Sequence, residues 1–233
     1  GMVSVKDFRA AGYAPEALIN FLLLLGWSHP EAKEILSLDE AAEVFTMDRV
    51  GNTGAVFEPN KLNWLNGQWI RKLEIPELIE HIKPLLVNSK ELVAKVGDKA
   101  WGNALVDLRD GFATLLDADD LAGLLYGEEF VIQDEVREYL NSDELVNATK
   151  EVIAAWDNYL KDVVLEDGRD SLTDAQFSQI VSALKKLAKP PVVFKGLRIA
   201  VTGKLSGSEV KLLVPHMKVS LLRDRAASCL KGL

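Results

Sequence analysis

Apolar side chains recur every three or four residues along most of this 233-residue chain, and that spacing constrains its fold more than any other feature. An α-helix turns once in 3.6 residues, so the pattern puts the apolar side chains of each segment on one face. The β-branched runs that would indicate strands are few and short. The sequence therefore predicts an all-α fold.

Several helix starts are marked by capping residues. Ser37 is followed by Glu40, the spacing of a capping box in which each side chain bonds to the backbone of the other residue. Ser4 and Thr173 stand at equivalent positions before helical patterns. We therefore expect helices to begin directly after these three residues.

Gly67 lies inside a helix predicted from Pro59 to about Leu73. Glycine costs a helix interior about 1 kcal/mol relative to alanine, so its presence needs a reason. The two interpretations are a close approach by another backbone and a tolerated kink.

Two consecutive prolines, Pro190 and Pro191, are predicted to end the helix that begins after Thr173. Residues 192–194 are then expected to be extended, and the β-branched apolar segment 196–203 has the pattern of a strand. A polar loop, 204–208, and two closing helices follow.

The net charge of −8 is unevenly distributed. Residues 1–72 carry 7 basic and 9 acidic side chains, residues 73–188 carry 11 and 24, and residues 189–233 carry 9 and 2. The last segment is thus basic by seven charges. Two interpretations are open: the cations solvate outer helix faces, or a polyanion docks there.

No apolar stretch of the sequence is long enough to cross a bilayer, and no signal-peptide pattern occurs. The single cysteine, Cys229, has no partner for a disulfide or for metal binding. These features are typical of a soluble, cytoplasmic protein.

Catalytic signatures are missing from the sequence. His29, His81 and His216 are far apart and belong to no metal-ligand or nucleophile motif, and no phosphate-binding glycine loop occurs. The carboxylates occupy polar helix positions. The motifs therefore predict a protein that is not an enzyme and holds no metal or cofactor.

Two stretches carry a specific resemblance. The first comprises GYAPEALINF at 12–21, LGWS at 25–28 and FEPNKLNWLNGQWIR at 57–71. The second comprises LRIAVTG at 197–203 with SGSEV at 206–210, which is similar to the pattern LRxALTG followed by SGPE. Together they resemble the C-terminal half of bacterial-type glutamyl-tRNA synthetases, which are class I aminoacyl-tRNA synthetases of protein biosynthesis.

The resemblance implies an all-helical, tRNA-binding module. It implies a stem-contact region at 1–72 and two anticodon-binding subdomains at 73–135 and 136–233. The adenylate-binding HIGH and KMSKS motifs of the family are absent from this sequence. ATP and Mg²⁺ would then belong to a catalytic domain outside this chain, supplied in the same protein or in trans.

The resemblance also names candidate site residues. The loop after the second motif contacts the anticodon in the family, which here indicates Gly207, Ser208 and Val210, with Thr202 and Lys204 beside them. The stem-contact candidates are Trp64, Asn66 and Arg71.

In family members that accept only glutamate tRNA, an arginine before a Thr-Leu pair inspects the third anticodon base. Gly111 stands at that place here, as in members that also charge glutamine tRNA. Arg109, two residues earlier, either substitutes for it or is an exposed helix residue paired with Asp107 or Asp110. The expected partners are therefore glutamate tRNA and glutamine tRNA. A free-standing paralogue that keeps the fold as a protein-interaction module is the alternative.

Overall fold

The structure is a computed structural model that describes residues 4–51, 54, 56–141, 145–165 and 168–231. Helices account for nearly all its regular structure, and the described residues form no β-sheet, only two isolated bridges. The prediction of an all-α fold is confirmed. The chain divides into two compact units, Gly1–Leu121 and Ala122–Leu233, with the boundary inside α8 (Asp117–Tyr126). The finer division at 72 and 135 stays a prediction.

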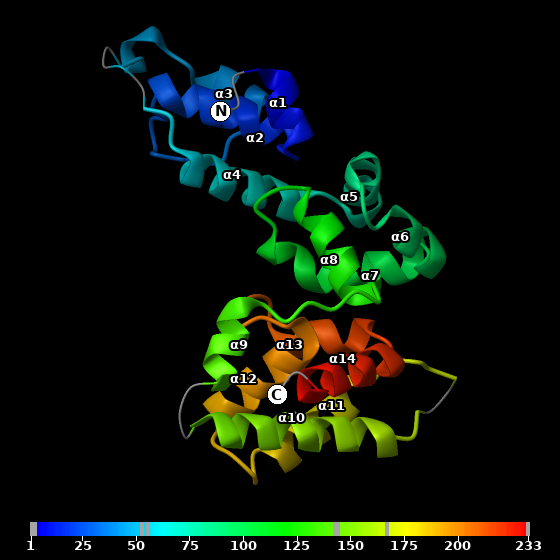
Figure 1. Cartoon of the computed structure of the whole chain (residues 1–233). Helices are drawn as coiled ribbons and strands as arrows, with labels where there is room; N and C mark the ends of the chain where they lie inside the picture. The colour runs from blue at the N-terminus through cyan, green and yellow to red at the C-terminus, as the bar shows by residue number, and fades with distance from the viewer. Residues whose placement is uncertain (1–3, 52–53, 55, 142–144, 166–167, 232–233) are drawn as a thin grey trace. The chain divides into compact units, whose positions relative to one another are not determined.

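The first unit contains α1 to α7 (Figure 1), and its short 3₁₀ segments include η2 and η3. Their bounds are α1 Val5–Ala10, α2 Pro15–Gly26, α3 Leu38–Val44, α4 Pro59–Lys72, α5 Ile75–Ile82, η2 Lys83–Leu85, α6 Lys90–Val96, α7 Asp98–Leu108 and η3 Arg109–Gly111. Helices α2 and α4 pack against each other through the fully buried Phe21, Leu62 and Leu65.

The predicted capping residues begin their helices as expected. Ser37 and Glu40 form a capping box before α3: the Ser37 hydroxyl accepts from the Glu40 amide at 3.1 Å, and the Glu40 carboxylate accepts from the Ser37 amide at 2.8 Å. Ser4 caps α1, and Thr173 caps α11 (Asp174–Leu184), in the same reciprocal way. Each cap satisfies two amide groups that a helix start leaves without partners.

Gly67 lies where another backbone approaches α4. A Cβ added there would come within 2.8 Å of the carbonyl oxygen of Phe112, closer than a methyl group and an oxygen can pack. Of the two interpretations, the close approach is therefore confirmed. Gly12 meets the same segment: its carbonyl accepts from the Leu115 amide at 2.9 Å, and its φ of +81° favours glycine.

The second unit is built around α10, with α12 and α14 packed against it (Figure 1). Its other helices are α9 Asp134–Asn141, α11 Asp174–Leu184 and α13 Val210–Leu213, while the three central ones are α10 Leu145–Asp162, α12 Pro190–Thr202 and α14 Val219–Lys231. Gly196 allows α10 and α12 to come close, because a Cβ there would meet the Val152 side chain at 2.8 Å. Trp156, Leu197 and Leu222 fill the core between them.

The prediction for residues 190–203 is wrong. Helix α11 ends at Leu184, five residues earlier than expected, and Pro190 and Pro191 begin α12 instead of ending a helix. Proline is tolerated in a first turn because its missing N–H has no helical partner there. The β-branched segment is helical because burial of one continuous face outweighs the weak strand preference of single residues.

None of the described helices has both the length and the apolar character that spanning a membrane requires.

Candidate nucleic-acid interface

The loop at 203–209 begins at Gly203, directly after α12. Gly203 adopts a left-handed conformation with φ +69°, the usual way in which a helix ends. A Cβ there would come within 2.3 Å of the carbonyl oxygen of Val131, and the Gly203 carbonyl accepts from the Gln133 amide at 3.0 Å. Both contacts fix the start of the 203–209 loop to the segment before α9.

Two side chains of α12 hold the 203–209 loop by hydrogen bonds to its backbone. The Thr202 hydroxyl donates to the Arg198 carbonyl at 2.7 Å and accepts from the Lys204 amide at 3.2 Å. The Arg198 guanidinium donates to the carbonyl of Gly207. Because these bonds tie both halves of the loop to one rigid helix, the loop backbone is held in place before any ligand arrives.

The predicted residues here divide into an exposed group and a supporting group. Lys204, Gly207 and Ser208 are exposed, whereas Thr202 is 8% exposed and Val210 only 4%. The exposed three are available to another molecule. Thr202 and Val210 anchor the two ends of the loop.

Arg198 was missed as a supporting residue. The signal was its spacing of four from Thr202, which puts both side chains on one face of a helix. That signal applies only if the segment is helical, and the segment had been predicted as extended.

Lys204 is the exposed cation of the loop, and no described carboxylate lies within ion-pair distance of it. The neighbouring Lys211 pairs with Glu209 at 3.0 Å, and Lys218 pairs with Asp170 at 2.9 Å. The loop therefore offers an unneutralised ammonium group, a serine hydroxyl and open backbone at one edge of the second unit.

The two arginines predicted in the first unit are occupied within the chain. The Arg109 guanidinium donates to the carbonyl of Leu73, at the junction of α4 and α5. Arg71 donates to the carbonyl of Asp110 at 2.8 Å. Both arginines therefore brace the backbone around η3. Gly111, at the end of η3, is exposed and faces open space.

Asn66 is fully buried at 0% exposure. Its side-chain oxygen accepts from the Ala14 amide at 2.8 Å, and its amide group donates to the carbonyls of Ala113 at 2.7 Å and Gly12 at 3.3 Å. A direct contact of this side chain with another molecule does not fit the described conformation. Asn66 instead joins α4 to the turns that contact it.

Trp64, the tryptophan predicted to contact the stem, differs in environment from Trp69 and Trp101. Trp64 is 42% exposed on α4, whereas Trp101 is 1% exposed in the core. Trp69 is half-buried, and its indole N–H donates to the Asn20 side-chain oxygen at 3.2 Å. Of the three, Trp64 has the largest free surface for stacking.

Among the described residues, no three His, Cys, Asp or Glu side chains are placed to hold a metal ion. Burial raises the pKa of Cys229 to about 12, so its thiol stays protonated and unreactive at neutral pH.

Asp119 is nine-tenths buried and binds the turn before α6. Its carboxylate accepts from the Asn88 amide at 3.1 Å and the Ser89 amide at 2.9 Å, as well as from both side chains. Burial alone would raise the pKa of this carboxyl group, but the hydrogen bonds outweigh it and lower the pKa. The role of Asp119 is structural.

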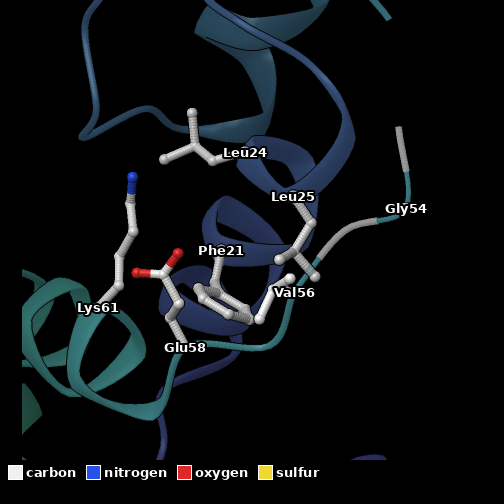
Figure 2. A pocket seen from close by; sticks show the side chains of 7 residues that line it. All are labelled: Phe21, Leu24, Leu25, Gly54, Val56, Glu58 and Lys61. Carbon is white, nitrogen blue, oxygen red and sulfur yellow. The ribbon is translucent and has the colours of Figure 1, made fainter. Parts of the chain in front are cut away.

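An open cavity of about 280 Å³ lies between α2 and the start of α4 (Figure 2). Its apolar wall includes Phe21, Leu24 and Leu25, and Glu58 and Lys61 stand at its rim. Val56, which lines the cavity, is 72% exposed, and Leu22, on the same helix as Phe21, is 55% exposed. A partner surface is one reason for leaving such a face uncovered.

Comparison with known proteins identifies relatives for this arrangement. The family of class I tRNA synthetases (E and Q), catalytic domain, matches residues 1–64. The glutamate–tRNA ligase of Bdellovibrio bacteriovorus is 34% identical over 99% of this chain and 46% of its own length. That of Aquifex aeolicus is 34% identical over the whole chain and 48% of its own length.

Solved structures agree on the fold. The glutamate–tRNA synthetase of Elizabethkingia anophelis superposes with a TM-score of 0.72 at 20% identity, covering 96% of this chain and 42% of that protein. The glutamate–tRNA ligase of Elizabethkingia meningosepticum gives 0.71 at 21% identity. The chain thus spans about half the length of the relatives it matches, and its resemblance to the C-terminal half of glutamyl-tRNA synthetases is confirmed.

Proposed function

Because this chain resembles the C-terminal half of glutamate–tRNA ligases along nearly its whole length, we propose that it binds tRNA and reads the anticodon without catalysing a reaction itself. The observation that carries the proposal is the 203–209 loop. Its backbone is held rigidly by Arg198 and Thr202, while Lys204 and Ser208 point their polar groups to solvent. Such a loop can contact phosphates and the edges of unpaired bases.

A titration of the chain with fluorescently labelled tRNA tests this proposal. We expect glutamate tRNA to bind more tightly than an unrelated tRNA, with an affinity that falls as salt rises. Lys204→Glu should weaken binding and reduce the salt dependence. Lys99→Glu, an equal charge change at an exposed lysine of the first unit, is the matched control. Equal binding of all tRNAs, or equal effects of both variants, would refute the proposed anticodon reading.

We also propose that the chain accepts both glutamate and glutamine tRNAs. Gly111 supports this, because a residue without a side chain supplies no donor to distinguish bases, whereas an arginine offers a rigid pair of donors. The space around Gly111 is open, so Gly111→Arg should fold normally. It is expected to separate the two tRNAs by about 1–3 kcal/mol, the value of one specific base contact. Affinities for the two tRNAs that differ already in the wild type would contradict the proposal.

A second candidate function is protein interaction, favoured by the exposed apolar side chains around the cavity of Figure 2. The partner we propose is a glutamate–tRNA ligase catalytic domain acting in trans, which would supply ATP and Mg²⁺ binding. This chain alone should then show no ATP–pyrophosphate exchange. Leu22→Glu should abolish co-elution with such a domain, whereas Val87→Glu, at a more exposed apolar residue elsewhere, should not. Co-elution that survives Leu22→Glu would contradict this assignment.

A tRNA-binding role also favours a cytoplasmic location, which fluorescence microscopy of a tagged chain can test.

A further inference from the structure

A second cationic surface lies at the other end of α12 from the 203–209 loop. Phe194 is 41% exposed there. The ammonium group of Lys185 lies 5.3 Å from the centre of its ring, and Lys189 and Lys195 are exposed beside it in sequence. We call Lys185, Lys189, Phe194 and Lys195 the Phe194 platform.

The lysines of the Phe194 platform are not neutralised within the described chain. No described carboxylate lies within ion-pair distance of any of the three, and Lys195 rests over the Tyr139 ring at 4.5 Å. The helix dipole accounts for Lys185, which follows the C-terminus of α11, where a cation is stabilising. It does not account for Lys189, which caps the positive end of α12 and is repelled there.

We propose that the Phe194 platform binds a single-stranded segment of RNA, with Phe194 stacking on an unpaired base and the lysines contacting phosphates. An exposed aromatic ring among unpaired cations is the arrangement by which proteins bind single strands without reading sequence. The inference rests on the proposed tRNA binding and adds a second contact to it.

Arg198 lies between the Phe194 platform and the 203–209 loop on α12. Phe194 and Arg198 are four residues apart, hence on one face of α12 and about 6 Å apart along its axis. Arg198 in turn contacts the carbonyl of Gly207 in the loop. A single strand of RNA that contacts the 203–209 loop and continues along this face of α12 would therefore reach Phe194.

Substitutions at Phe194 test whether its ring stacks on a base or makes only an apolar contact with the RNA. In the tRNA titration, Phe194→Leu keeps an apolar side chain but removes the ring, and should weaken binding roughly five- to a hundredfold, the usual effect of losing one stacked base. Phe194→Trp keeps a stacking surface and should bind like the wild type. Circular dichroism and thermal melts of both variants establish that the fold is retained.

Substitutions of the lysines test the phosphate contacts. Lys189→Ala with Lys195→Ala should lower the slope of log affinity against log salt by about 1.4, two single-strand phosphate contacts. The double control Lys95→Ala with Lys99→Ala removes the same charge from the first unit and should leave the slope unchanged. Unlabelled oligouridylate should compete with tRNA for the wild type and less well for Phe194→Leu.

The outcomes distinguish the two proposals. If the wild type binds tRNA and the platform variants bind it equally well, the Phe194 platform is overturned while the proposed function stands. If the wild type binds no tRNA above an unrelated control, the proposed function fails and the platform fails with it. A platform whose substitution affects a protein partner but not RNA would also overturn the inference.

Discussion

Replacing Arg225, a buried residue of α14, should destabilise the second unit. Arg225 is only 1% exposed, yet it has no carboxylate partner among the described residues. Its guanidinium instead donates to three backbone carbonyls: that of Val201 at 2.8 Å, that of Leu124 at 2.8 Å and that of Gly127 at 3.0 Å. It also lies 5.5 Å from the ring of Phe130. One side chain thus joins α14 to the end of α12 and to the segment before α9.

The magnitude follows from what the substitution leaves behind. Arg225→Met fills similar space but removes the donor to one buried carbonyl group, that of Val201, and to two partly buried ones. A fully buried carbonyl without a donor costs about 1–3 kcal/mol, and a partly buried one costs less. Removing the buried charge offsets part of this loss of stability, because burial of the guanidinium is itself unfavourable. That cost is visible in its pKa, which burial lowers to about 10. We expect a net loss of about 3 kcal/mol in the free energy of unfolding of this unit.

Urea unfolding followed by hydrogen exchange measures this loss and locates it. Arg225→Met should lower the unfolding free energy and speed exchange within residues 122–233, with less effect on the first unit. Arg225→Lys should be intermediate, because an ammonium group keeps the charge but lacks the planar fork. Arg223→Met, an exposed arginine on the same helix, is the control and should stay within about 0.5 kcal/mol of the wild type. An Arg225→Met protein as stable as that control would refute the reasoning.

Three further predictions concern single residues. Gly67→Ala should lower the free energy of unfolding of the first unit by about 1–3 kcal/mol in urea melts, because the added methyl group meets the Phe112 carbonyl. This loss should outweigh the higher helix propensity of alanine. Gly123→Ala, in open space on α8, is the control and should be neutral or stabilising. Asp119→Asn should cost about 1–2 kcal/mol at pH 7. Because the folded-state pKa of Asp119 is lowered, its contribution is present above the unfolded pKa and is lost as pH falls through the folded one, so wild type and variant should converge in stability in acid. Cys229 should react with a thiol reagent only as fast as the second unit opens, so a fast reaction in the native protein would contradict its burial.

The parts of the fold that local chemistry decides were predictable from the sequence. The capping box at Ser37 and the helix cap at Thr173 were identified correctly because every atom involved lies within three residues of the cap. The helix at 190–202 was not, because its β-branched residues carry a weak local preference that packing against α10 overrides. Because this segment was predicted to be extended, the support that Arg198 gives to the 203–209 loop could not be predicted, since it depends on the helical spacing of Arg198 and Thr202.

Contacts between residues far apart in the sequence also limited the prediction of the site residues. Asn66 stands in a stretch that resembles a tRNA-contacting region, but its partners lie 47 to 54 residues away, and only the folded chain reveals that they bury it completely. Exposed polar residues of a motif and buried ones look alike in a sequence. The exposed glycine and lysine of the 203–209 loop were predictable because loops with such residues lie at surfaces.

Basic side chains are unevenly distributed along the chain, and this distribution bears on the proposed function. In the first unit, Arg71 and Arg109 donate to backbone carbonyls of their own chain, and the unit carries 12 basic and 19 acidic side chains. In the second unit, Lys189, Lys195 and Lys204 have no described ion-pair partner. The whole unit carries 15 basic and 16 acidic side chains, but residues 175–233 carry 11 basic and 2 acidic ones. Counterion release requires cations that are free to meet phosphates. We therefore expect residues 175–233 to contribute most of the salt dependence of the proposed tRNA binding.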